Sequence, residues 1–280
     1  MTEANAPETG GGGKRPSVAI IGIGAMGKAL ATGMLAAGWA PSQLSLAIRR
    51  PEQLESLRAE SGVTVSLDPR EASSEREVIV IAVKPRDVPM LLEAVGGGIT
   101  PGQIVLSIAA GVPTSTFEKA LGEVPVVRAM PNTPALVGQG VTGVAAGQFA
   151  RPADVAKTLV ILKAVGSVRE MDEGLLDAVT AVSGTGPAYV FLLAEALTEA
   201  AVREGLPRDV AESFVHQTIR GAGHLLTETG QGPSELRSQV TSPGGTTAAA
   251  MHVLEERGFR AVVEDAVRAA AQRARELGVG

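Results

Sequence analysis

Three glycines near the start of the chain constrain its fold more than any other feature. They follow the apolar run 18–21 and lead into a helical stretch that ends near Leu35. The pattern consists of Gly22, Ile23, Gly24, Ala25, Met26 and Gly27. In this arrangement the first glycine permits a tight turn, the second lets another group approach the backbone, and the third lets a helix pack closely on a strand. The segment therefore predicts a strand, a sharp turn and a helix.

The first half of the chain alternates short β-branched runs with helical segments. The runs that predict strands are 18–21, 44–48, 78–83, 104–108, 124–128, 141–145 and 167–170. Their continuous apolar character is typical of strands that are buried on both faces of a sheet. Alternation of strands and helices predicts parallel βαβ units, and we expect them to form one α/β domain over residues 15–173.

From about Gly174 onward the periodicity is helical. We expect helices at 175–182, 187–204, 209–228, 246–257 and 259–277, which together form an all-α domain over residues 174–280. The helix that begins at Pro187 is apolar nearly all round, so every side of it must be covered. A small helical domain cannot cover all these faces by itself. The sequence therefore predicts a homo-oligomer.

Composition excludes several kinds of site. The chain has no cysteine, which excludes disulfides and thiol nucleophiles, and its three histidines are too scattered to form a metal site. We therefore expect no metal. A formal net charge of −5 and the lack of any run of basic residues argue against a nucleic-acid partner.

The amino-terminal residues 1–14 are polar and include four consecutive glycines. They lack the apolar core of a signal peptide, and we expect them to form a disordered tail. The longest apolar helical stretch, 189–201, is interrupted by Glu195 and Glu199 and is shorter than the roughly 20 residues that a bilayer requires. The sequence therefore predicts a soluble, cytoplasmic protein without a membrane partner.

Between a strand and a helix, the three glycines predict a dinucleotide site of the Rossmann type, with the pyrophosphate at the helix start. A glycine-rich packing turn is the alternative. The second strand leads into Arg49 and Arg50 instead of an acidic residue, which favours NADPH over NADH as the cofactor. The same two arginines would also suit a solvated loop.

Two further segments follow predicted strands at their carboxyl ends, where ligands bind in open α/β sheets. Small residues there would let the rest of the cofactor approach the backbone, although each segment alone is also compatible with an ordinary turn. The residues are Ala82, Val83, Lys84 and Pro85 after one strand, and Ala109, Ala110 and Gly111 after another.

The stretch 240–250 combines a turn with a helix start. Pro243 and the pair Gly244-Gly245 end any preceding helix, and we expect Thr246 or Thr247 to cap the helix that follows. Free N–H groups at a helix start attract anions. From the residues alone, both a plain capped helix and a cradle for a small carboxylate remain open.

Five segments, in this order and spacing, resemble the pyrroline-5-carboxylate reductase family: 22–27, 82–85, 128–134, 183–189 and 240–247. The resemblance implies reduction of 1-pyrroline-5-carboxylate to L-proline with NADPH or NADH, the last step of proline biosynthesis. It also implies a Rossmann-type domain followed by an all-α dimerisation domain, with dimers that often gather into decamers.

By position, the resemblance implies that residues 22–27 hold the pyrophosphate, and that the segments after the other strands hold the rest of the cofactor. It places Asn132 near the nicotinamide and Glu173 near the substrate. The substrate carboxylate would be held by Ser242, Gly245, Thr246 and Thr247, with the Thr247 hydroxyl near the ring nitrogen. At Asp68-Pro69 the match is weaker, since relatives often have an Asn there near the adenosine phosphate, so cofactor preference is less defined than activity.

Two other functions are alternatives. β-Hydroxyacid dehydrogenases have a similar glycine turn and helical second half, but they resemble one another in a catalytic lysine on the helix after the domain junction. The predicted helix 187–204 has no lysine, so alcohol oxidation would lack its base. A protein that senses a dinucleotide without turnover would need no carboxylate cradle, although the fold alone does not exclude it.

Overall fold

The computed structural model describes residues 15–278, which form two compact units. The second unit is Thr180–Glu276, and the first contains the residues up to Val179 together with Leu277 and Gly278. The predicted disordered tail lies outside the described residues. The contact boundary falls a few residues after the predicted domain boundary, because the first helical turns still pack on the sheet. Leu176 is fully buried there, and its side chain is close to Gly143 of the sheet.

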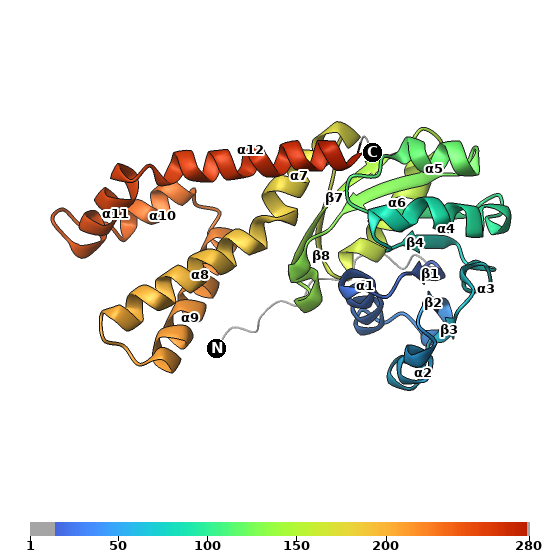
Figure 1. Ribbon diagram of the computed structural model, residues 1–280, viewed down its shortest axis with the longest axis horizontal. Coiled ribbons are helices and arrows are strands. Elements are labelled where there is room, and N and C mark those ends of the chain that lie inside the picture. The colour runs from blue at the N-terminus through green and yellow to red at the C-terminus, as the bar shows by residue number, and fades with distance from the viewer. Residues whose placement is uncertain (1–14, 279–280) are drawn as a thin grey trace. The chain divides into compact units, whose positions relative to one another are not determined.

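The first unit contains an eight-stranded sheet with the order β3-β2-β1-β4-β5-β6-β7-β8 (Figure 1). All neighbouring strands are parallel except β6 and β7. The predicted strands are present with ends shifted by at most two residues, and β3 was not predicted. The strands are β1 Val18–Ile21, β2 Leu44–Ala47, β3 Thr64–Ser66, β4 Val78–Ile81, β5 Ile104–Ser107, β6 Val126–Met130, β7 Gly140–Ala146 and β8 Gly166–Glu170.

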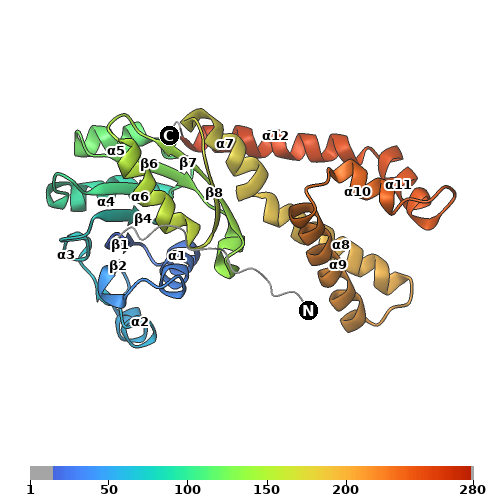
Figure 2. The same ribbon diagram turned by 180° about the vertical axis from the view of Figure 1, so that it is seen from behind.

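Helices cover both faces of this sheet, as the views from the two sides show (Figures 1 and 2). The α-helices of the unit are α1 Ala25–Ala36, α2 Leu54–Ser61, α3 Pro69–Ser73, α4 Val88–Val95, α5 Thr114–Leu121, α6 Pro152–Lys163 and α7 Leu176–Val179. Short 3₁₀-helical segments include η2 Pro51–Gln53, η3 Pro85–Asp87, η5 Thr133–Val137 and η6 Glu173–Leu175.

Alternate residues of the central strands supply two separate cores. On one face Ile20 packs in a cluster with Leu30 of α1 and Ile161 of α6. On the other face Ile79 packs in a cluster with Leu92 of α4 and Phe117 of α5. Successive side chains of a strand point to opposite faces, so two apolar cores require the continuous apolar runs seen in the sequence.

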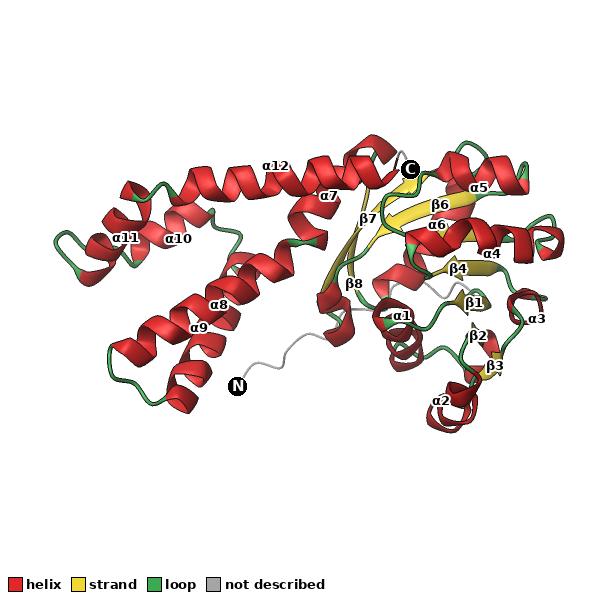
Figure 3. Cartoon of the chain, viewed as in Figure 1, coloured by secondary structure: helices red, strands yellow, loops and turns green. Residues whose placement is uncertain are grey.

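The second unit is helical, with no strand among its described residues (Figure 3). Two of its elements differ from expectation. The single helix predicted at 175–182 is divided among η6, α7 and a π-helical turn, and α10 was not predicted. The elements are the π-helix η7 Thr180–Gly184, then α8 Gly186–Arg203, α9 Arg208–Glu228, α10 Pro233–Gln239, α11 Thr246–Glu256 and α12 Phe259–Gly278.

The π-helical turn is held by two side chains. Thr185 Oγ1 donates to the carbonyl oxygen of Thr180 at 2.9 Å, and the Tyr189 hydroxyl donates to that of Ala181 at 3.1 Å. Single π turns are rare and often occur at functional sites. This one stands at the chain boundary between the two units, so the predicted uniform helix was wrong at this point.

Helix α8 exposes much of its apolar surface. Phe191 and Leu192 are 61% and 66% exposed, and Phe214 of α9 is 67% exposed. By length and mean hydropathy, 1.3, the helical segment Glu173–Arg203 could also cross a membrane, which the shorter stretch considered in the sequence could not. A helix that is covered by another protein chain can have the same length and hydropathy. The apolar surface alone therefore does not distinguish a membrane-spanning helix from a helix at a protein interface.

The close pairing of β7 with β8 can be tested by a substitution at Gly166, the first residue of β8. Gly166 has φ +149°, and a Cβ atom on it would collide with the backbone of Gly140. We expect Gly166→Ala to lower the free energy of unfolding by about 2 kcal/mol or more, measured by chemical denaturation. Gly97→Ala is the matched control, since its Cβ would meet no atom within 4 Å. Equal losses in the two variants would contradict the expectation.

Candidate active site

The turn between β1 and α1 gives each glycine a distinct task. Gly22 has φ +100°, and a Cβ atom on it would lie 2.8 Å from the carbonyl oxygen of Ala82. A Cβ on Gly27 would collide with the carbonyl oxygen of Gly22, whereas one on Gly24 would meet no atom within 4 Å. The turn is therefore closed below by packing and open at Gly24, which is the shape that a bound pyrophosphate requires.

The start of α1 supplies the charge for such a group. Gly24 is the N-cap of α1 and offers no side-chain hydrogen bond, and the first backbone bond runs from Lys28 N to Gly24 O at 2.9 Å. The N–H groups before Lys28 therefore have no partner within the helix. They point along the helix axis at its positive end, which favours an anion.

Parallel pairing brings the predicted cofactor residues to one edge of the sheet. The last residues of β1, β2, β4 and β5 are in register, with Ile21 beside both Ala47 and Ile81, and Ile81 beside Ser107. Ser107 also pairs with Arg128 of β6, which continues to Met130. Strand order reverses between β1 and β4, where open α/β sheets bind their ligands. The residues that follow these strand ends are the predicted ones: residues 22–27, Arg49 and Arg50, residues 82–85, residues 109–111, and Asn132.

Arg49 and Arg50 lie on the surface after β2. Arg49 Nη2 forms an ion pair with Asp87 Oδ2 at 2.7 Å, and the Arg49 side chain is 67% exposed. Asp87 ends η3, which follows β4, so this pair connects two of the predicted cofactor loops. Their contact with a 2′-phosphate stays a prediction.

Asn132 is buried between β6 and η5. Its Oδ1 accepts a hydrogen bond from the backbone N–H of Val141 at 2.9 Å, which ties the end of β6 to β7. The amide therefore has a structural task at the edge where the resemblance places the nicotinamide.

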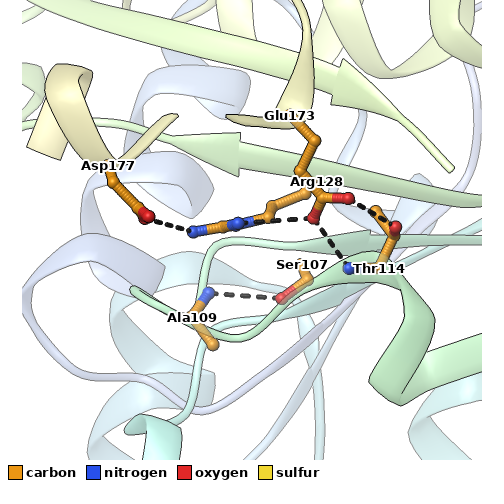
Figure 4. A network of polar contacts seen from close by, with 6 residues as sticks. All are labelled: Ser107, Ala109, Thr114, Arg128, Glu173 and Asp177. Carbon is orange, nitrogen blue, oxygen red and sulfur yellow. Dashed lines mark hydrogen bonds and ion pairs between the residues drawn. The ribbon is translucent and has the colours of Figure 1, made fainter. Parts of the chain in front are cut away.

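A buried arginine that the sequence analysis did not select as a site residue lies at the same edge (Figure 4). The side chain of Arg128, in β6, is only 6% exposed. Its Nη1 lies 3.3 Å from Glu173 Oε1, and its Nη2 lies 3.5 Å from Asp177 Oδ1. The available signal was a charged residue directly between apolar neighbours, Val127 and Ala129, at the end of the predicted strand 124–128. A guanidinium that is buried requires partners.

Glu173 also binds the start of α5. Its Oε1 accepts a hydrogen bond from Thr114 N at 2.8 Å, and its Oε2 accepts one from Thr114 Oγ1 at 2.7 Å. Glu173 thus belongs to the first unit, whereas Ser242, Gly245, Thr246 and Thr247 belong to the second.

The predicted carboxylate cradle is the turn between α10 and α11. Gly244 has φ +68°, Gly245 N donates to Ser242 O at 3.1 Å, and the Ser242 hydroxyl lies beside Gly245. The predicted cap by Thr246 or Thr247 is wrong. Gly245 is the N-cap with no side-chain hydrogen bond, because both threonines already lie inside α11. The first N–H groups of α11 therefore remain without a capping side chain, which suits an anion.

Glu255 connects the three helices around this turn. It pairs with Arg260 of α12 at 2.7 Å and with Arg237 of α10 at 3.4 Å. The hydrogen bond from Arg260 is the largest cause that holds the pKa of Glu255 below its usual value. The two arginines therefore favour the ionised form of a carboxylate that links α10, α11 and α12.

Family models match both parts of the chain. Residues 173–277 match the model described as pyrroline-5-carboxylate reductase dimerisation. Residues 17–111 match the model described as NADP oxidoreductase, coenzyme F420-dependent.

Relatives extend over nearly the whole chain. The pyrroline-5-carboxylate reductase of Synechocystis is 42% identical over 92% of this chain and 97% of that protein. The Arabidopsis thaliana enzyme of the same name is 38% identical over 93% of this chain and 95% of that protein. The chain belongs to the pyrroline-5-carboxylate reductase family.

Solved structures agree with this family. The pyrroline-5-carboxylate reductase of Coxiella burnetii has a TM-score of 0.89 and 37% identity, with 94% of this chain and 99% of that chain covered. The Plasmodium falciparum pyrroline carboxylate reductase, solved with NADP bound, has a TM-score of 0.84 and 29% identity, with 94% and 98% covered. The predicted fold, a Rossmann-type domain followed by a helical dimerisation domain, is confirmed.

The glycine turn of this reductase gives a direct test. We expect Gly24→Ala to weaken NADPH binding about tenfold, or about 1.4 kcal/mol, because the added methyl group would occupy the open space expected to hold the pyrophosphate. The midpoint of thermal unfolding should stay unchanged, because the methyl group meets no protein atom within 4 Å. Gly27→Ala should lower both the affinity for NADPH and the midpoint of thermal unfolding, since its Cβ would collide with Gly22. NADPH fluorescence titration measures the first quantity. Wild-type affinity in Gly24→Ala would contradict the assignment.

Proposed function

We propose that this chain reduces 1-pyrroline-5-carboxylate to L-proline by hydride transfer from NAD(P)H, the last step of proline biosynthesis. The observation that carries this function is that relatives 37–42% identical, all named pyrroline-5-carboxylate reductase, match over 92–94% of the chain. Both units are therefore included in the likeness, which a shared dinucleotide fold alone would not require.

The residues at the carboxyl edge of the sheet fit NAD(P)H. When bound, NAD(P)H supplies the hydride. Residues 22–27 would hold its pyrophosphate with the free N–H groups of α1, and residues 82–85, residues 109–111 and Asn132 would hold the nicotinamide half. Arg49 and Arg50 stand where an acidic residue would bind a ribose hydroxyl, so we assign a preference for NADPH, with NADH as the second donor.

The turn between α10 and α11 would hold the substrate carboxylate. The N–H groups at the start of α11 and the hydroxyls of Ser242 and Thr246 supply donors, and Gly245 lets the anion approach the backbone. Thr247 would donate its hydroxyl hydrogen bond to the ring nitrogen and orient the imine.

No strong base is needed for this reaction. The imine carbon is electrophilic once the nitrogen is protonated, so positioning and a nearby donor are the main contributions of the protein. A threonine hydroxyl is a poor acid, and we assign the proton to solvent or to an imine that binds already protonated. Thr247 is thus an orienting donor or a proton relay.

The two domains would divide this work. Residues 15–173 would bind the cofactor, and residues 174–280 would bind substrate and form the dimer, with dimers or decamers as the assembly. Exposed apolar side chains on α8 and α9 and the match to a dimerisation model support a homo-oligomer. We assign the enzyme to the cytoplasm and assign the apolar surface of α8 to contact with another copy. The net charge of −5 supports a function without nucleic acid.

The reaction class can be tested with two substrates. We expect NADPH to be oxidised when 1-pyrroline-5-carboxylate is supplied, with no NADP⁺ reduction when 3-hydroxyisobutyrate is supplied. The measurement is the absorbance of the reduced cofactor. Turnover of the hydroxy acid instead of the imine would refute the reductase, and NADPH binding without either turnover would favour a sensor.

The hydroxyl of Thr247 gives a second test. We expect Thr247→Ala to lose tenfold or more in turnover, about 1.4 kcal/mol of barrier, because the ring nitrogen loses its orienting donor. Thr247→Ser keeps the hydroxyl and should retain most of the rate. Steady-state kinetics at saturating NADPH measure both. A wild-type kcat in Thr247→Ala would remove this role from the residue.

A further inference from the structure

We propose that Arg128 and Glu173 are positioning residues that fix the loop between β5 and α5 for cofactor binding, and that Glu173 does not contact the substrate. The proposal rests on the proposed function for the identity of the reaction. Its central measurement, the affinity for NADPH alone, is independent of turnover.

Both carboxylate oxygens of Glu173 are already engaged by the first unit. Oε1 accepts from Thr114 N at 2.8 Å and lies 3.3 Å from Arg128 Nη1, and Oε2 accepts from Thr114 Oγ1 at 2.7 Å. These contacts set the orientation of the carboxylate through three separate donors (Figure 4). A group held in this way is suited to support another segment, rather than to move onto a ligand.

The helix that Glu173 supports cannot cap itself. The N-cap of α5 is Pro113, whose side chain offers no hydrogen bond, and Thr114 is the first helical residue. The N–H of Thr114 has no partner within the helix. Glu173, 59 residues further along the chain, supplies the acceptor and places a negative charge at the positive end of the helix.

The same contacts define the end of a loop with predicted cofactor residues. The loop leaves β5 at Ser107, whose buried hydroxyl accepts from Ala109 N at 3.3 Å, and it enters α5 at Thr114. Between these points lies Gly111, which is buried and has φ +76°. Ser107 is paired with Arg128 in the sheet, so one end of the loop neighbours Arg128 and the other end is bound by Glu173.

Arg128 fixes the position of Glu173. Its guanidinium, 6% exposed, lies between Glu173 and Asp177, which are one helical turn apart on η6 and α7. A buried charge that loses a partner is costly, so the guanidinium holds the segment with both carboxylates in place. The sequence of contacts therefore runs from Arg128 to Glu173 and from Glu173 to Thr114, and the backbone connects Thr114 to the loop at residues 109–111.

Four variants of the full-length enzyme test this sequence of contacts. Thr114→Val removes only the hydroxyl, and Thr114→Ser restores it. Glu173→Ala removes both acceptors, and Glu55→Gln is a control at a carboxylate that is 84% exposed in an ion pair on α2. For each, we would measure the Kd for NADPH by fluorescence titration, the KM for NADPH and for the imine substrate, kcat and the midpoint of thermal unfolding.

We expect Thr114→Val and Glu173→Ala to raise the Kd and KM for NADPH by about fivefold or more, and fivefold is about 1 kcal/mol, the net contribution of a typical hydrogen bond. At saturating NADPH, the KM for the imine substrate should stay within about twofold of wild type, as expected when uniform cofactor binding alone is lost. Thr114→Ser and Glu55→Gln should bind NADPH as the wild type does.

Three results would overturn the proposal. One is a selective rise in the KM for the imine substrate in Glu173→Ala with wild-type NADPH affinity, which would assign Glu173 to the substrate. Another is wild-type NADPH affinity in Thr114→Val. The third is a loss of stability in Thr114→Val that also occurs in Thr114→Ser, although serine keeps the hydroxyl. If Glu173→Ala does not fold, the two Thr114 variants decide. Failure of the wild type to oxidise NADPH when the imine is supplied would refute the proposed function, and the Kd comparison would still stand.

Discussion

Parallel pairing of β1 with β2 on one side and with β4 on the other is the constraint on which the first unit depends. Because Ile21 is in register with both Ala47 and Ile81, three strands end at the same level and their loops meet at one edge. Parallel neighbours also require crossover helices, which cover both faces of the sheet. The edge is therefore the part of this sheet that is left for a ligand.

The second unit depends on a different condition. It has no sheet among its described residues, and α8 presents apolar side chains such as Phe191 and Leu192 that its own unit leaves exposed. An apolar face of this kind is stable in water only when it is covered. The match of residues 173–277 to a dimerisation model supports another copy of the chain as the cover. Its fold and its oligomeric state consequently have the same physical cause.

Local patterns predicted the elements whose causes are local. The run 18–21 became β1 with the same ends, because four apolar residues precede a glycine turn. Strand β3 was missed since it has only three residues, of which Thr64 is exposed. The helix at 175–182 was wrong because its π turn is held by Thr185 and Tyr189, which lie outside the predicted segment. The predicted cap at Thr246 or Thr247 was wrong because Gly245, with its extended backbone, is the N-cap. Helix α11 therefore already begins at Thr246.

The candidate site divides in the same way. The glycine turn is contained in six residues, so its geometry was predictable from spacing. By contrast, Arg128 and Glu173 are 45 residues apart, and Thr114 and Glu173 are 59 apart. A buried arginine in a strand indicates that a carboxylate must be near, but it does not say which one. Resemblance to a family assigns a residue its place in the site, but it does not identify the hydrogen-bond partners of that residue. For Glu173 the partners decide the role, because a carboxylate whose two oxygens hold a helix start and a guanidinium acts on the cofactor loop through that helix.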